Sequence, residues 1–325
     1  MSINNYPWLN EIYKNVIRQY KKNILHHAIL IESFYKVKKK KLILEITKWL
    51  LCKKKKYYKS CNICANCKLV MSNNYPDLYL IKEKLDNLKK TGVNEIRKII
   101  NNIYYKPQYG KKKIVWLFKV SNMNKFQINS LLKVLEEPPK NTWFFISDIK
   151  NNKLLETFRS RCLVYTIIVP INISIKWLNK YTNYNNEQCF IAIKLNNNSP
   201  IDAKKEINNF LLEKRFFLYQ KFLFSIKKND FVSLFDHLNS KNVIQNILWI
   251  CFLLLDVIKY KLNCLNFILN KDCKNIIYNI SKIYSYRKVV EIINIFFKCR
   301  YNIINIPNIN TELLIIDSLI KCEKF

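Results

Sequence analysis

The chain has 325 residues, half of them hydrophobic, so it is long enough for two or three domains with substantial cores. Its 56 lysine and arginine residues outnumber its 23 acidic residues and give a formal charge of +33, which would attract polyanions such as nucleic acids. Only seven of the basic residues are arginine, however, and drift toward A/T-rich codons would produce the same excess of lysine, asparagine and isoleucine. The charge alone therefore assigns no function.

The cysteines and the apolar segments predict a reduced, cytoplasmic protein. The 11 cysteines are spread along a chain that is far too long for a small disulfide scaffold. The N-terminal segment lacks the apolar core of a signal peptide. The longest apolar run, 247–255, is about half as long as a membrane span. We therefore expect no association with a membrane.

Residues 1–168 alternate between strand-like and helical patterns. Runs rich in β-branched and aromatic residues lie at 27–31, 77–81, 113–118, 142–147 and 162–167. Segments with helical periodicity lie between them, at 38–51, 93–104, 124–136 and 152–159. This alternation predicts an α/β domain in which a parallel sheet carries helices on both faces.

After Pro170 the pattern becomes helical. Residues 171–207 contain one helical stretch followed by a polar segment, 196–200. From 208 onward apolar residues recur at spacings of three and four, which predicts an α-helical bundle. We therefore predict an α/β domain, a small helical domain and a larger helical domain, at 1–168, 169–207 and 208–325.

Four cysteines inserted at 52–67 form the strongest chemical motif. Their spacing is C-x8-C-x2-C-x2-C, at Cys52, Cys61, Cys64 and Cys67. Four thiolates complete a tetrahedral zinc shell and leave no position for a catalytic water, so we predict a structural zinc site. The lysines at 53–56 and 59 are expected to lower the pKa of the thiols.

Three alternatives to zinc stay open. An iron–sulfur cluster would need a further cysteine followed by proline just downstream, where this chain has Val70, Met71 and Ser72. A redox pair would use two of the cysteines and would leave the evenly spaced third one unexplained. Buried thiols without a metal are the third alternative.

The segment 28–44 has the strand-loop-helix order of a phosphate-binding loop but contains no glycine. Its loop, 32–41, therefore lacks the residues that let backbone N–H groups wrap a phosphate. The strand-like run 113–118 continues into Lys119 and Val120, where a phosphoryl-transfer site needs carboxylates to hold Mg²⁺. Since both parts are missing together, we predict no productive ATP binding. We interpret the lysines at 38–41 as a solvated helix start.

The sequence FRSRC at 158–162 places two arginines just before the fifth strand-like run. An arginine at the edge of an α/β domain can stabilise the charge of a γ-phosphate bound by a neighbouring subunit. A solvated basic turn is the alternative interpretation.

Taken together, these segments resemble the delta-prime subunits of the bacterial DNA polymerase III clamp loader, which belong to the AAA+ superfamily. The resemblance rests on YPWL (6–9), HHAILI (26–31), the four cysteines, YPDLYLI (75–81), LLKVLEEPP (131–139), TWFF (142–145) and RSRC (159–162). It is dense over 1–168 and faint afterwards, although NTELLIIDSLI at 310–320 fits the last helix of the family.

The resemblance implies an AAA+ type α/β domain at 1–168, a small helical lid at 169–207 and a helical collar at 208–325. It implies a complex with the tau/gamma motor subunits and the delta subunit, which opens the sliding clamp and places it on primed DNA. The chain would be a component of the polymerase (nucleotidyltransferase) holoenzyme, with no intrinsic catalysis.

The resemblance also implies roles for single residues. Arg161 matches the arginine finger that reaches the ATP site of an adjacent motor subunit, and Ser160 and Cys162 would position its turn. The four cysteines would hold a structural Zn²⁺. Two other functions remain alternatives: an autonomous AAA+ ATPase and a zinc-containing DNA-binding protein.

Overall fold

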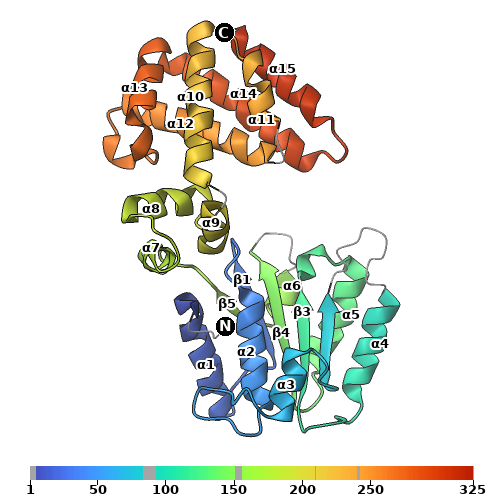
Figure 1. The fold of residues 1–325 in the computed structure, drawn as a ribbon. Helices are drawn as coiled ribbons and strands as arrows, with labels where there is room; N and C mark the ends of the chain where they lie inside the picture. Colours follow the sequence, from blue (N-terminus) through green and yellow to red (C-terminus); the bar gives the residue numbers. More distant parts are fainter. Residues whose placement is uncertain (1–4, 83–92, 151–155, 209, 240–241, 325) are drawn as a thin grey trace. The chain divides into compact units, whose positions relative to one another are not determined.

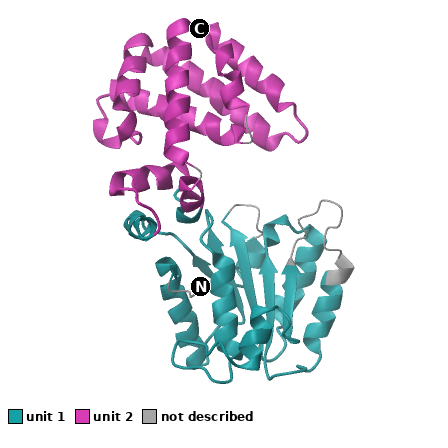
Figure 2. Ribbon diagram, viewed as in Figure 1, with its two compact units in different colours: residues 1–180, 198–201 teal, residues 181–197, 202–325 magenta. Residues whose placement is uncertain are grey.

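The computed structural model describes residues 5–82, 93–150, 156–208, 210–239 and 242–324. The chain divides into two compact units (Figure 2), unit 1 with residues 1–180 and 198–201, and unit 2 with residues 181–197 and 202–325. Unit 1 is built on one sheet, and the described residues of unit 2 form helices and no strand (Figure 1). The predicted fold class, an α/β domain built on a parallel sheet and followed by helical domains, is confirmed. The domain boundaries at 168 and 207 stay predictions.

A five-stranded parallel sheet with the strand order β2-β3-β4-β1-β5 organises unit 1. The strands are β1 (Ala28–Ser33), β2 (Leu78–Lys82), β3 (Lys113–Phe118), β4 (Thr142–Ile149) and β5 (Leu163–Thr166). All five were predicted from the sequence, because parallel strands are buried on both faces and read as continuous apolar runs. Since β1 lies between β4 and β5, the carboxyl ends of these three strands meet at one edge.

Helices cover both faces of the sheet, because successive strand residues point to opposite sides. On one face, Leu30, Val115 and Phe144 share a buried cluster with residues of three helices. These are α4 (Val93–Tyr104), α5 (Lys125–Glu136) and α6 (Glu156–Arg159). On the other face, the indole of Trp116 donates a hydrogen bond to Thr47 of α2 at 2.8 Å. The elements on this side are η2 (Pro7–Leu9), α1 (Asn10–Lys21), α2 (Lys39–Leu51) and α3 (Ala65–Met71).

The segment 171–207 holds three helices, so the prediction of one helical stretch was wrong. They are α7 (Ile171–Asn179), α8 (Asn186–Leu195) and α9 (Pro200–Ile207). A capping box starts α8, since the side chains of Asn185 and Gln188 each accept a hydrogen bond from the other's backbone N–H. Pro200 is the first residue of α9, where proline is favoured. These local start signals, rather than apolar periodicity, mark the short helices.

From residue 210 onward the described residues of unit 2 form a helical bundle, the structure predicted for 208–325. Its helices are α10 (Leu211–Lys228), α11 (Phe235–Leu238), α12 (Val243–Lys261), α13 (Lys274–Ile283), α14 (Tyr286–Asn305) and α15 (Thr311–Glu323). Short 3₁₀ turns lie at Val232–Leu234, Leu265–Phe267 and Lys271–Cys273. The helix α12 packs against α10, α13 and α14 and forms the centre of the bundle.

Among the described residues, α12 is the one helix whose length and composition would let it cross a membrane. Inside unit 2, however, it is a core helix that buries ten residues, including the carboxylate of Asp256. This carboxylate accepts hydrogen bonds from the backbone N–H groups of Leu269 and Asn270 and from the ammonium of Lys259. The side chain of Asn270 accepts a hydrogen bond from the fully buried guanidinium of Arg215 on α10. Packing within the bundle therefore accounts for the apolar character of α12.

Candidate functional site

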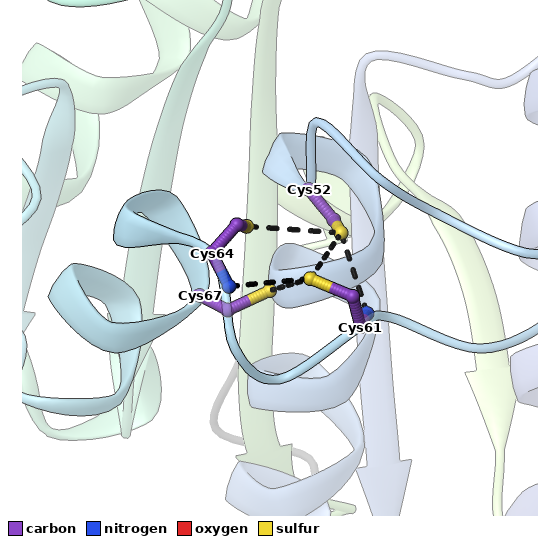
Figure 3. Close-up of side chains that lie close together, drawn as sticks. All are labelled: Cys52, Cys61, Cys64 and Cys67. Atoms are coloured by element: carbon purple, nitrogen blue, oxygen red, sulfur yellow. Dashed lines mark hydrogen bonds between the residues drawn. The ribbon is translucent and has the colours of Figure 1, made fainter.

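The four predicted zinc ligands lie together at the end of α2 (Figure 3). Cys52 follows α2, Cys61 lies in the next loop, and Cys64 and Cys67 lie at the start of α3. The sulfur of Cys52 is 3.5 Å from that of Cys61 and 4.0 Å from that of Cys64. The sulfurs of Cys61 and Cys67 are 3.9 Å apart. Zinc–sulfur bonds of about 2.3 Å in a tetrahedron place the sulfurs about 3.8 Å apart. The four thiols therefore fit one tetrahedral zinc ion.

Backbone N–H groups set the acidity of two of these thiols. The N–H of Cys64 donates to the sulfur of Cys61 at 3.3 Å, and such contacts lower the pKa of Cys61 to about 6. Burial acts to raise the pKa of Cys64, but the N–H groups of Cys67 and Lys53 outweigh it and lower this pKa. Burial raises the pKa of Cys52 and of Cys67. The prediction that neighbouring lysines lower the pKa of all four thiols was therefore wrong. The pKa is lowered for Cys61 and Cys64 only, and the cause is the backbone N–H groups.

The loop between β1 and α2 is bound by side chains from other parts of unit 1. Its main-chain carbonyls at Lys36 and Val37 accept hydrogen bonds from the hydroxyl of Ser199 at 3.3 Å and from the indole of Trp8 at 3.2 Å. Lys38, just before α2, has a left-handed conformation with φ of 63°, which favours glycine. Two main-chain carbonyls of the loop are thus already hydrogen-bonded within the chain.

Lys39 is the first residue of α2, and its side chain turns inward. Its ammonium donates a hydrogen bond to the main-chain carbonyl of Asp148 on β4, and burial lowers its pKa to about 8. Lys38 and Lys40 on either side are exposed. The interpretation of this segment as a solvated helix start is correct for these two neighbours and wrong for Lys39.

A carboxylate reaches the turn after β3 from the neighbouring strand. In the turn itself, Lys119 has a left-handed conformation and Val120 is fully buried. Asp148, close to the end of β4, accepts hydrogen bonds from the backbone N–H of Ser121 at 2.6 Å and from its hydroxyl at 2.8 Å. Asp148 was not among the residues predicted from the sequence, although it is the one acidic residue in the otherwise largely apolar strand β4.

The inward position of Lys39 predicts a pH-dependent contribution to stability. Because its pKa in the folded chain lies below the ordinary 10.5, the unfolded chain binds more protons between pH 8 and 10.5, and stability rises with pH in that window. We expect the free energy of unfolding, relative to that of Lys39→Met, to increase by about 1 to 2 kcal/mol between about pH 7 and pH 10. Urea denaturation of both chains measures the difference, and a value independent of pH would place the ammonium in solvent.

The two arginines of FRSRC have different surroundings. Arg159 donates to the carboxylate of Glu32 at 2.5 Å, and Glu32 is almost completely buried at the end of β1. Arg161 is one-third exposed and forms an ion pair with Glu136, the last residue of α5. Its Nε donates to Glu136 at 2.8 Å, and its Nη1 donates to the main-chain carbonyl of Thr157 at 2.7 Å. The ion pair joins the LLKVLEEPP segment to the RSRC segment, a pairing that sequence analysis did not find.

The neighbours of Arg161 are held by the same turn. The hydroxyl of Ser160 donates to the main-chain carbonyl of Thr157 at 3.0 Å, so Ser160 and Arg161 share an acceptor. The backbone N–H of Cys162 bonds the carbonyl of Arg159 at 3.1 Å. Burial raises the pKa of the Cys162 thiol to about 12, which keeps it neutral. These contacts give the turn a defined shape.

Comparison with known proteins identifies the family. Residues 8–170 match the family model described as DNA polymerase III, delta subunit, and residues 210–324 match the model of its C-terminal region. The chain is 37% identical to the DNA polymerase III subunit delta' of Buchnera aphidicola subsp. Schizaphis graminum, over 98% of this chain and 97% of the relative. The chain belongs to the delta-prime family of DNA polymerase III subunits.

Two further relatives extend the comparison. The delta-prime subunit of Escherichia coli (strain K12) is 29% identical over 98% of this chain and 96% of its own length. The tau/gamma subunit of Haemophilus influenzae is 33% identical over 145 residues, which are 45% of this chain and 20% of that protein. The resemblance to the delta-prime family is therefore confirmed, and the roles of Arg161 and of the four cysteines stay predictions.

Proposed function

We propose that the chain is a subunit of a DNA polymerase III clamp loader that does not hydrolyse ATP and supplies Arg161 to the ATP site of an adjacent motor subunit. It acts in the cytoplasm with tau/gamma and delta subunits to load the sliding clamp onto primed DNA. Membership in the delta-prime family supports the place in the holoenzyme. Similarity to tau/gamma supports packing beside subunits of the same fold.

The contacts of Arg161 carry this proposal. A guanidinium has five N–H donors in a planar fork that matches the oxygens of a phosphate. Glu136 and Thr157 accept three hydrogen bonds from it, and within the described residues the structure gives no further partner for the remaining two donors. Arg161 is therefore held in one orientation, is one-third exposed, and keeps donors for a phosphate of another chain.

The phosphate-loop segment supports a chain without its own ATPase activity. A phosphate-binding loop needs free backbone N–H groups and a lysine ammonium directed at the phosphates. Here the ammonium of Lys39 is engaged by Asp148, and Lys119 and Val120 stand where Mg²⁺ would need carboxylates. Both features favour the non-hydrolysing subunit over an autonomous AAA+ ATPase.

The cysteine cluster supports a structural Zn²⁺ held by Cys52, Cys61, Cys64 and Cys67. All four positions of a tetrahedral shell would be filled by thiolates, so the metal would cross-link the end of α2 to α3. The cluster would therefore shape this part of unit 1 and take no part in ATP chemistry.

The proposal is tested by assembly and by nucleotide binding. When the chain is co-expressed with its cognate tau/gamma and delta subunits, we expect one complex to elute on size exclusion. We expect the isolated chain to show neither turnover nor saturable binding at micromolar ATP, while the tau/gamma subunit serves as the positive control in the same assay. Micromolar affinity with turnover by the isolated chain would identify an autonomous ATPase instead.

A further inference from the structure

A surface rich in lysine and tyrosine lies beside the cysteine cluster at one end of unit 1. We call it the lysine–tyrosine surface and define it by the segments 20–22, 53–59 and 109–112. These segments contain nine lysines, four tyrosines and no acidic residue. They come together because α1 and α2 end, and β3 begins, at the same end of the unit (Figure 1).

Aromatic rings hold the ammonium groups of this surface in place. The Nζ of Lys21 lies 3.8 Å from the ring centre of Tyr57, and the Nζ of Lys55 lies 4.5 Å from that of Trp49. Lys53 lies 5.7 Å from the ring centre of Tyr109. None of these lysines forms an ion pair with a carboxylate in the described part of the chain. These ammonium groups are thus held close together by cation–π contacts, and no carboxylate of the described residues neutralises their charge.

Two of the ammonium groups crowd each other. Lys112 lies over the ring of Tyr20 at 4.6 Å and donates to the main-chain carbonyl of Leu50 at 3.0 Å, so it caps the end of α2. Lys55 also lies over Tyr20, at 5.5 Å. Burial and then the charge of Lys112 lower the pKa of Lys55. An anion placed between them would relieve this repulsion.

A small hairpin presents an aromatic ring next to these cations. The backbone of Lys56 pairs with that of Lys59, with an N–H to carbonyl distance of 2.9 Å, so the two tyrosines between them form the tip. The side chain of Tyr57 is 74% exposed. The main-chain carbonyl of Tyr58 accepts a hydrogen bond from the hydroxyl of Tyr13 at 2.8 Å, which fixes the hairpin on α1.

The negative charge that a zinc ion with four thiolates would carry does not explain why so many lysines lie beside the cysteine cluster. Zinc with four thiolates carries a net charge of about −2, which a few lysines would neutralise. Codon drift explains many lysines, but it gives no reason for Lys21, Lys53, Lys55 and Lys112 to gather around aromatic rings while no carboxylate of the described residues pairs with them. A ligand with several negative charges fits the surface better than either explanation.

We propose that the lysine–tyrosine surface binds single-stranded nucleic acid, with phosphates between Lys21, Lys53 and Lys55 and a base stacked on Tyr57. Proteins that bind single strands combine a basic surface with exposed aromatic rings on which bases stack. A duplex keeps its bases stacked inside, and an acidic peptide has no planar base to place on Tyr57. This binding site goes beyond the clamp-loader role, which does not depend on it.

Fluorescence anisotropy of the full zinc-loaded chain with labelled oligo(dT) of about 20 nucleotides tests the proposal. The triple variant Lys21→Ala, Lys53→Ala, Lys55→Ala should bind at least about tenfold more weakly, and the slope of log K against log salt should fall by about 2, because each phosphate contact contributes about 0.7. Tyr57→Ala should weaken binding by about 5- to 100-fold and change this slope by less than the triple variant does, since it removes the stacking ring and the π contact to Lys21 but no charge.

A matched triple variant in unit 2 provides the control. Lys228, Lys282 and Lys288 lie 4.5, 4.4 and 4.5 Å from the ring centres of Phe224, Tyr278 and Tyr284, so their replacement by alanine removes the same charge and the same kind of contact. This control should bind oligo(dT) within twofold of the native chain. Equal weakening in both triple variants, or no effect of Tyr57→Ala, would overturn the site. Equal affinity for duplex DNA or for polyglutamate would overturn the assignment to single strands.

Discussion

The variant Arg161→Ala is expected to slow ATP turnover at the neighbouring motor site, and clamp loading with it, by up to about 10³-fold. Alanine removes the donors that would bond the γ-phosphate oxygens as charge develops in the transition state. The complex should still assemble, because Arg161 is a partly exposed side chain whose ion pair with Glu136 contributes little to folding. Steady-state ATPase and clamp loading in the reconstituted complex measure the effect.

Two further variants show whether the effect requires the guanidinium of Arg161: one keeps the positive charge, and the other removes an arginine elsewhere as a control. Arg161→Lys keeps the positive charge and loses the planar fork, so it should recover only a small part of the activity. Arg287→Ala removes an exposed arginine at the start of α14 and should leave loading unchanged. If Arg161→Ala loads clamps at the native rate, RSRC is a solvated basic turn.

Glu136 shows why the sequence could predict the arginine but not its support. The turn RSRC and the helix end at Glu136 are each visible as short motifs, but they lie 25 residues apart, and one sequence carries no record of which residues touch. The same holds for Lys39 and Asp148, which are 109 residues apart. The cysteine cluster was predictable because all four cysteines lie within one short segment, and a tetrahedral zinc site would require all of them.

The same limit applies to the secondary structure, where the sequence predicted some elements and missed others. The strands β1 and β3 are buried along their whole length, and their apolar runs predicted them directly. The segment 171–207 was predicted to hold one helical stretch and holds three helices, of which α8 starts at a capping box. Sequence periodicity thus predicted the long buried elements and underestimated the number of short helices between residues 171 and 207.

Removing the metal is expected to release the segment between α2 and α3 while the sheet stays folded. Structural zinc contributes about 10 kcal/mol or more of apparent binding free energy in small zinc domains. The helix α3 has only seven residues, fewer than an isolated helix needs, so it would not be stable by itself without the metal. Two side-chain hydrogen bonds, from Asn66 to Leu51 and from Tyr13 to Tyr58, would still hold the segment, at about 0.5–1.5 kcal/mol each. A zinc ion held by the four cysteines would therefore dominate the local stability.

Trypsin measures this release, because the lysines at 53–56 and 59 provide cleavage sites inside the segment. We expect about one zinc per chain in the purified protein, and fast cleavage at these lysines only after chelation or in Cys64→Ser. Cys264→Ser changes an exposed cysteine outside the cluster and should leave both zinc content and cleavage as in the native chain. Iron with visible absorbance would assign an iron–sulfur cluster, and cleavage that is unaffected by chelation would mean that the thiols hold no structural metal. Since the buried cluster beneath α4, α5 and α6 contains none of the four cysteines, the sheet should keep its thermal transition after chelation and in Cys64→Ser.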